Sequence, residues 1–219
     1  MHPEITKIIA CQVVMEEMLP LLPEGVDCEK MDFGLHANPD KLKKALQEKI
    51  NASENGKGTI LLGYGLCSRA VAGLRSEKCS LVVPRVDDCI GIFLGSREAY
   101  FKQAKTEPGS YYLTKGWIEA GDSMFGTYNQ MIERYGPEQA ERLIKLMLKN
   151  YTRLVFINTG KYEVEHYREY SKQTAARFDL KFEEIKGATT FVDKMIKGPW
   201  DEEFIVAPPG HEITFEAFY

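Results

Sequence analysis

Residues 59–69 read TILLGYGLCSR, an apolar run that ends in two glycines and a cysteine. A continuous apolar run is typical of a strand buried on both faces of a parallel sheet. Gly63 and Gly65 permit a tight turn and a close approach of the backbone to a ligand. The pattern of residues 68–74 predicts a helix, so Cys67 is expected where the strand gives way to a helix start, which stabilises a thiolate.

The rest of the chain alternates strand-like and helix-like segments, which predicts an α/β fold of mostly parallel sheets with flanking helices. The order strand, helix, strand in residues 5–65 returns in residues 153–210. We therefore expect two similar lobes around a cleft, with a single doubly wound sheet as the alternative. The expected parts are an N-terminal α/β lobe that carries the cysteines, a connecting helical segment and a C-terminal α/β lobe: residues 1–105, 106–152 and 153–219.

Composition limits the classes of partner. The 219 residues include 28 basic and 32 acidic side chains, a net charge of −4, which offers no general attraction to nucleic acid or to an anionic membrane surface. No apolar segment approaches the roughly 20 residues that span a bilayer, and residues 1–4, MHPE, lack the basic start of a signal peptide. We expect a cytoplasmic protein, and the aromatic stretch FEAFY at residues 215–219 offers a surface for a homo-oligomer.

The five cysteines are an odd number, which argues against a disulfide framework, and all lie within the first 89 residues. Ligands of open parallel sheets bind outside the carboxyl ends of the strands. Four candidate metal ligands follow predicted strands: Cys11, His36, Cys67 and Cys89. Three sulfurs and one imidazole are typical of tetrahedral zinc, or of part of an iron–sulfur or cobalt-handling site. The alternative is that the cysteines are small buried hydrophobic residues.

From this pattern we predict that the three sulfurs share one ligand sphere, with His36 as the fourth ligand and Asp88 in reserve. A separate set of residues is a candidate site for a small anionic ligand. Ser96 and Arg97 place a hydroxyl and a guanidinium at a predicted helix start, although Ser96 as a plain helix cap is the alternative. The other members of this set are Gly63, Gly65, Arg85 and Asp88.

Two further features of the sequence bear on cofactor binding and on the expected cleft. The glycines at 63, 65 and 73 do not form a dinucleotide-binding fingerprint, because the third comes too late. His211 follows a predicted strand end, from which it would reach the cleft from the C-terminal lobe.

A series of motifs in one order resembles the family called domain of unknown function 1638. The motifs are IAC at 9–11, LHANP at 35–39, GYGLC at 63–67, PR at 84–85, DCI at 88–90, LGSR at 94–97, YYLT at 111–114, GW at 116–117 and PPG at 208–210. The resemblance implies a role near corrinoid-dependent methyl transfer and one-carbon metabolism in anaerobes, in company with a corrinoid protein or a methyltransferase. It supplies no catalytic assignment, but the four candidate metal ligands fall in its motifs.

Two functional hypotheses follow. In the first, the protein is an enzyme or accessory factor of methyl transfer, in which cysteine-bound zinc activates a thiol or the cysteines receive an iron–sulfur cluster or a corrinoid. In the second, it is a non-catalytic binding module for a small anionic ligand at Ser96, Arg97 and the turn of residues 63–67.

Overall fold

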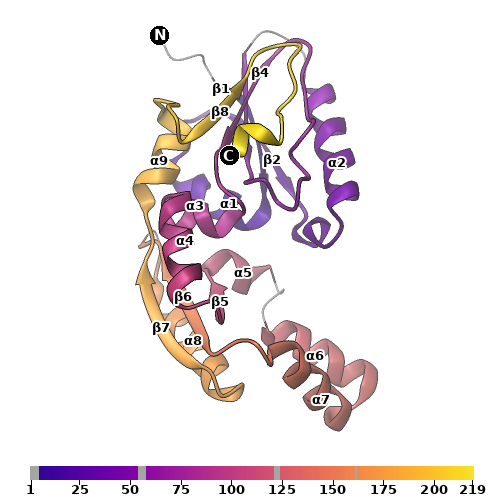
Figure 1. Ribbon diagram of the computed structural model, residues 1–219, viewed down its shortest axis with the longest axis vertical. Helices are drawn as coiled ribbons and strands as arrows, with labels where there is room; N and C mark the ends of the chain where they lie inside the picture. Colours follow the sequence, from indigo (N-terminus) through magenta and orange to yellow (C-terminus); the bar gives the residue numbers. More distant parts are fainter. Residues whose placement is uncertain (1–4, 54–57, 121–123, 161) are drawn as a thin grey trace. The chain divides into compact units, whose positions relative to one another are not determined.

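The structure is a computed structural model that describes residues 5–53, 58–120, 124–160 and 162–219 (Figure 1). Residues 1–4, which bear on the signal-peptide expectation, lie outside that part. The chain divides into two compact units. Unit 1 is Met1–Ala99 together with Ala188–Tyr219, and unit 2 is Tyr100–Gly187. Unit 1 is therefore assembled from two separate stretches of sequence.

This division differs from the expected lobes. Residues 188–219 were placed in a C-terminal lobe, but they belong with the N-terminal residues in unit 1. The reason is a strand pairing: β8 (Phe204–Ala207) lies beside β4 (Ser80–Pro84), so the chain returns to the first sheet after completing unit 2. Residues 106–152 are part of unit 2 and do not form a separate connection.

Unit 1 contains a five-stranded sheet in the order β2-β1-β3-β4-β8. Besides β4 and β8, this sheet contains β1 (Ile5–Cys11), β2 (Asp27–Met31) and β3 (Thr59–Gly63). The first four strands in this order pair in parallel, whereas β8 is antiparallel to β4. Every residue of β3 is buried, as expected for the central strand of a sheet covered on both faces. Carboxyl ends of the parallel strands meet at one edge of the sheet.

Helices cover both sides of this sheet. The described helices that begin in unit 1 are α1 (Gln12–Met18), η1 (Leu19–Leu21), η2 (Phe33–Ala37), α2 (Pro39–Ala52), α3 (Cys89–Leu94), α4 (Arg97–Thr106), α9 (Thr189–Lys197) and η3 (Glu216–Phe218). Of these, α4 continues into unit 2. Helix α2 begins where the Asn38 side chain accepts a hydrogen bond from the Lys41 amide at 3.0 Å, with Pro39 at the first turn. In Figure 1, α2 lies on one side of the strands and α9, which contacts α1 and α3, on the other.

Unit 2 contains a parallel three-stranded sheet in the order β5-β6-β7. Its elements are β5 (Ser110–Leu113), α5 (Lys115–Glu119), α6 (Met124–Tyr135), α7 (Pro137–Leu148), β6 (Arg153–Asn158), α8 (Val164–Arg177) and β7 (Lys181–Lys186). Helix α8 packs on β6 and β7. The side chain of Arg153, a residue only 3% exposed, donates to Ser110, Gln103 and Glu183 at 2.7 to 2.8 Å. Hydrogen bonds to all three partners satisfy a buried charge.

The predicted fold class, α/β with mostly parallel sheets, is confirmed. The predicted helix over residues 68–74 is wrong, because these residues form turns. Cys67, Ser68 and Arg69 have positive φ angles of 47°, 54° and 72°. A run of three non-glycine residues in the left-handed region cannot begin a right-handed helix.

Candidate functional site

Three cysteines lie in segments that leave the same edge of the unit 1 sheet. Cys11 is the last residue of β1, Cys67 follows the end of β3, and Cys89 follows the end of β4. These strands are adjacent and parallel, so their carboxyl ends are neighbours. Burial raises the pKa of Cys89, and charge on Cys67, Asp88 or Cys11 raises it further.

Backbone hydrogen bonds join the segment after β3 to the segment after β4. The Leu66 amide donates to the Val86 carbonyl at 2.8 Å, and the Cys67 amide donates to the Asp87 carbonyl at 2.9 Å. Gly65 allows this contact: a Cβ there would lie 2.7 Å from the Val86 carbonyl oxygen and 2.8 Å from the Asp88 nitrogen. Gly65 is thus required by close approach of the protein's own backbone, whereas the sequence interpretation allowed for a ligand.

The left-handed turn fixes the position of Cys67. It is closed by the Ala70 amide, which donates to the Cys67 carbonyl at 3.1 Å, and by the Ala72 amide, which donates to Arg69 at 3.2 Å. Non-glycine residues in this region each cost about 1–3 kcal/mol, and such strain gathers at binding and catalytic sites. The helix start expected at Cys67 is instead found at the other two cysteines, since Cys11 precedes α1 and Cys89 begins α3.

Burial governs the protonation of the three thiols. It raises the pKa of Cys11, outweighing the amides of Val13 and Val14, which lower it. Burial, aided by the charge of Asp88, raises the pKa of Cys67 to about 12, and that of Cys89 lies well above its ordinary value. The thiols are therefore protonated at neutral pH, and a metal ion that binds them has to displace protons.

Tyr64 is a polar side chain at this site that the sequence interpretation missed. It lies between Gly63 and Gly65 and is only 3% exposed. Its hydroxyl oxygen is buried and has no hydrogen-bond partner among the residues that the structure describes. Burial raises the pKa of the Tyr64 phenol, and the nearby Cys11, Cys67 and Cys89 raise it further. The signal available in the sequence was an aromatic residue between two glycines.

The two other proposed metal ligands are held by local contacts. His36, in η2, is exposed, and its Nδ1 lies 2.5 Å from the Phe33 carbonyl oxygen. A contact of one ring nitrogen with a carbonyl oxygen is the one expected of a ligating histidine. Asp88 accepts hydrogen bonds from the Ile90 and Gly91 amides at 2.9 and 3.4 Å as the cap of α3. Among the described residues, no three His, Cys, Asp or Glu side chains already form a metal-binding group.

The candidate anion-binding residues have internal roles. Ser96 accepts a hydrogen bond from the Ala99 amide at 3.0 Å, which is the plain capping alternative. Arg97 donates to Asp87 at 3.1 Å and to the Phe218 carbonyl at 2.8 Å, and it stacks on Tyr219. Arg85, which follows β4, has a buried Nε for which the described part of the chain supplies no hydrogen-bond partner.

Residues 213–219, which we call the C-terminal clasp, contact the left-handed turn of residues 67–69 through Arg69. Ile213 is fully buried, and its amide donates to the Leu74 carbonyl at 2.9 Å. The Phe215 ring lies 4.4 Å from the guanidinium carbon of Arg69, the last residue of the left-handed turn. Through Arg69 and Arg97 the clasp touches the segments that carry Cys67 and Cys89.

The remaining candidates lie elsewhere. Cys28 stands at the amino end of β2, where its thiol donates to the Val26 carbonyl at 3.5 Å, and Cys79 is buried before β4. His211, expected to reach the cleft from a C-terminal lobe, belongs to unit 1 and is exposed.

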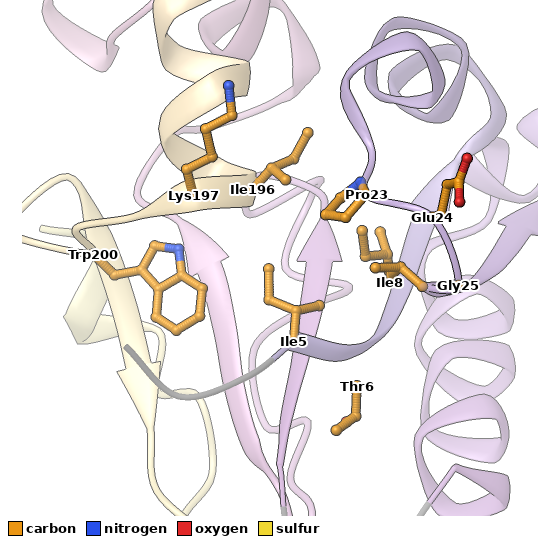
Figure 2. Close-up of a pocket in the computed structure, with 10 residues that line it drawn as sticks. Ile5, Thr6, Ile8, Pro23, Glu24, Gly25, Ile196, Lys197 and Trp200 are labelled. Atoms are coloured by element: carbon orange, nitrogen blue, oxygen red, sulfur yellow. The ribbon is translucent and has the colours of Figure 1, made fainter. Parts of the chain in front are cut away.

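A cavity of about 500 Å³ in unit 1 lies near the amino end of β1, away from the edge where the cysteines leave the sheet (Figure 2). Its walls combine apolar side chains, among them Ile5, Ile8 and Trp200, with polar surface that includes the charged Glu24 and Lys197. The Trp200 indole donates to the Met195 carbonyl at 3.0 Å, so it is satisfied without a ligand. The cavity contains no thiol, and we assign the candidate site to the cysteines.

Comparison with known proteins gives one match. The model of a family described as "Protein of unknown function (DUF1638)" matches residues 30–196. No curated protein and no solved structure matches the chain. Within the described residues, no helix combines the length and the apolar character needed to cross a membrane.

Proposed function

The chain belongs to the DUF1638 family, and we propose that it is a metal- or cofactor-binding protein whose Cys11, Cys67 and Cys89 hold a thiophilic metal. The observation that supports this proposal is that the three cysteines, on three separate segments, leave the same edge of the sheet at the ends of adjacent parallel strands. Cysteines that serve only as small hydrophobic residues have no reason to gather in this way, and two of the five do not.

The chemistry of the three sulfurs favours zinc or an iron–sulfur cluster, both of which bind cysteine thiolates. Zinc–sulfur bonds of about 2.3 Å in a tetrahedron place neighbouring sulfurs about 3.8 Å apart. Since no such group is preformed among the described side chains, mononuclear zinc requires the thiols to move together on binding. Three protein ligands leave one coordination position open, as in catalytic zinc sites.

The biological role in this proposal comes from the family resemblance. The protein acts in the cytoplasm as an enzyme or accessory factor of corrinoid-dependent methyl transfer, with a corrinoid protein or methyltransferase as partner. A thiolate-bound zinc would supply a Lewis acid that activates a thiol. The anion-binding module is the weaker candidate, because Ser96 and Arg97 already have partners within the protein.

Metal analysis of protein purified without oxygen tests the proposal. We expect about one equivalent of zinc, or iron and sulfide with visible absorption if the group is a cluster. Replacement of Cys11, Cys67 or Cys89 by serine should abolish stoichiometric binding, whereas the matched control Cys28→Ser should retain it. Addition of Zn²⁺ or of iron and sulfide to the metal-free protein extends the test. Failure to bind under both conditions would refute the proposal.

A further inference from the structure

We propose that the hydroxyl of Tyr64 is the hydrogen-bond donor for a small ligand that occupies the open position beside Cys11, Cys67 and Cys89. This inference rests on the proposed metal site and assigns the class of ligand that completes it. The ligand presents a hydrogen-bond acceptor, as an anionic oxygen, nitrogen or sulfur atom bound to the metal would do.

The first step concerns the hydroxyl itself. Tyr64 is 3% exposed, and its hydroxyl oxygen is buried with no hydrogen-bond partner in residues 5–53, 58–120, 124–160 and 162–219. A buried hydroxyl that loses water without gaining a partner destabilises the folded protein, so such groups are uncommon unless a ligand or an ordered water satisfies them. A phenylalanine would fill the same space without this cost. The hydroxyl therefore points to an occupant of the site.

The second step concerns the neighbours of the hydroxyl. Tyr64 directly follows β3 at the sheet edge that the segments of Cys11, Cys67 and Cys89 also leave, and ionisation of these thiols raises the pKa of its phenol. A thiol is only a weak donor and a weak acceptor, so the cysteines alone satisfy a phenol poorly. The strong partner has to come from whatever the thiols bind.

The third step concerns how the side chain is held. Gly63 precedes Tyr64, and a Cβ at Gly63 would lie 2.4 Å from the Cβ of Ala10, so β1 and β3 approach closely there. Gly65 follows it and packs against the backbone of residues 86–88. Tyr64 thus sits in a short segment fixed on both sides by contacts that admit no side chain. This fixed backbone suits a group that orients a ligand.

The experiment uses the full chain loaded with Co²⁺, with azide as the probe of the open position. Wild-type protein, Tyr64→Phe and the control Tyr112→Phe are titrated with azide, and the visible cobalt spectrum reports binding. Tyr112 also has a buried hydroxyl without a hydrogen-bond partner, but it lies in unit 2. We expect Tyr64→Phe to bind Co²⁺ normally and to bind azide about tenfold more weakly or worse, since a hydrogen bond to an anion is lost. Tyr112→Phe should match the wild type.

Thermal unfolding of the metal-free variants separates this role from a structural one. Because none of the described residues is a hydrogen-bond partner of the hydroxyl, Tyr64→Phe should not lower the midpoint of thermal unfolding. Normal Co²⁺ binding with unchanged azide affinity would overturn the inference and leave the proposed metal site standing. A midpoint that falls with unchanged azide affinity would also overturn it. If the wild-type protein takes up no Co²⁺, no zinc and no cluster, the metal site and this inference fail together.

Discussion

Replacement of Gly65 by alanine tests how the two cysteine segments are joined. The new Cβ would meet the Val86 carbonyl oxygen at 2.7 Å, the Asp88 nitrogen at 2.8 Å and the Asp88 Cα at 2.9 Å. All three atoms belong to the backbone, so no side-chain rotation relieves the contacts. The segment after β4 has to move away by about half an ångström or more to restore ordinary contact distances.

The expected cost has two parts. Overpacking costs about 1–3 kcal/mol, and weakening of the two hydrogen bonds from Leu66 and Cys67 adds up to about 1 kcal/mol each. We expect a total of about 2–4 kcal/mol, which lowers the thermal midpoint of a protein of this size by about 5–15 °C. Displacement of Cys89 relative to Cys67 should also weaken metal binding in the variant that remains folded.

Calorimetry measures the loss of stability, and hydrogen exchange at the Leu66 and Cys67 amides measures the weakening of their two hydrogen bonds. Gly210→Ala is the control, because Gly210 has a φ of +78° and no atom within 4 Å of the added Cβ. It should therefore cost only the roughly 1–2 kcal/mol of a left-handed alanine. If Gly65→Ala melted within about 2 °C of the wild type, with both amides still protected, the close packing described for this glycine would be refuted.

Three further outcomes are expected. Arg153→Ala should lower the free energy of unfolding in urea by about 3 kcal/mol, because Ser110, Gln103 and Glu183 lose the guanidinium that donates to them. A loss below about 1 kcal/mol would contradict a stabilising role for these hydrogen bonds. Cys67, with a pKa of about 12, should react with iodoacetamide at pH 8 about a thousandfold more slowly in the folded protein than in the urea-unfolded chain. The rate of this reaction should rise with pH. Equal rates in the two states, measured by mass spectrometry, would contradict the raised pKa. Arg97→Ala should cost about 1–2 kcal/mol and speed hydrogen exchange at Phe218, whereas unchanged exchange would show that the clasp does not depend on this arginine.

Much of the secondary structure was predictable because local signals agreed with the fold. Asn38 and Pro39 mark the start of α2, and the apolar run of residues 60–62 marks the central strand. That the segments of Cys11, Cys67 and Cys89 leave one edge of the sheet also followed from the strand ends, since a parallel sheet brings its carboxyl ends to one edge; that their sulfurs share one ligand sphere stays a prediction.

The errors arose where distant contacts override local preference. The spacing of residues 68–74 favours a helix, but the Leu66 and Cys67 amides donate to the carbonyls of Val86 and Asp87, and the chain then enters a left-handed turn at residues 67–69. The partner of β8 was unpredictable because its short apolar sequence carries no information about strand direction or about which sheet it joins. The buried hydroxyl of Tyr64 was missed because an aromatic residue in an apolar segment looks like ordinary core until its hydroxyl is placed.

The interrupted sequence of unit 1 has a consequence for synthesis on the ribosome. All residues of unit 2 are translated between β4 and β8, so at roughly 5–20 residues per second the edge of β4 waits on the order of ten seconds for its last strand. During that interval the nascent chain already contains Cys11, Cys67 and Cys89 but lacks the C-terminal clasp. We expect the growing chain to depend on chaperones that cover an open strand edge, and the thiols to be most accessible to metal and to oxidants before translation ends.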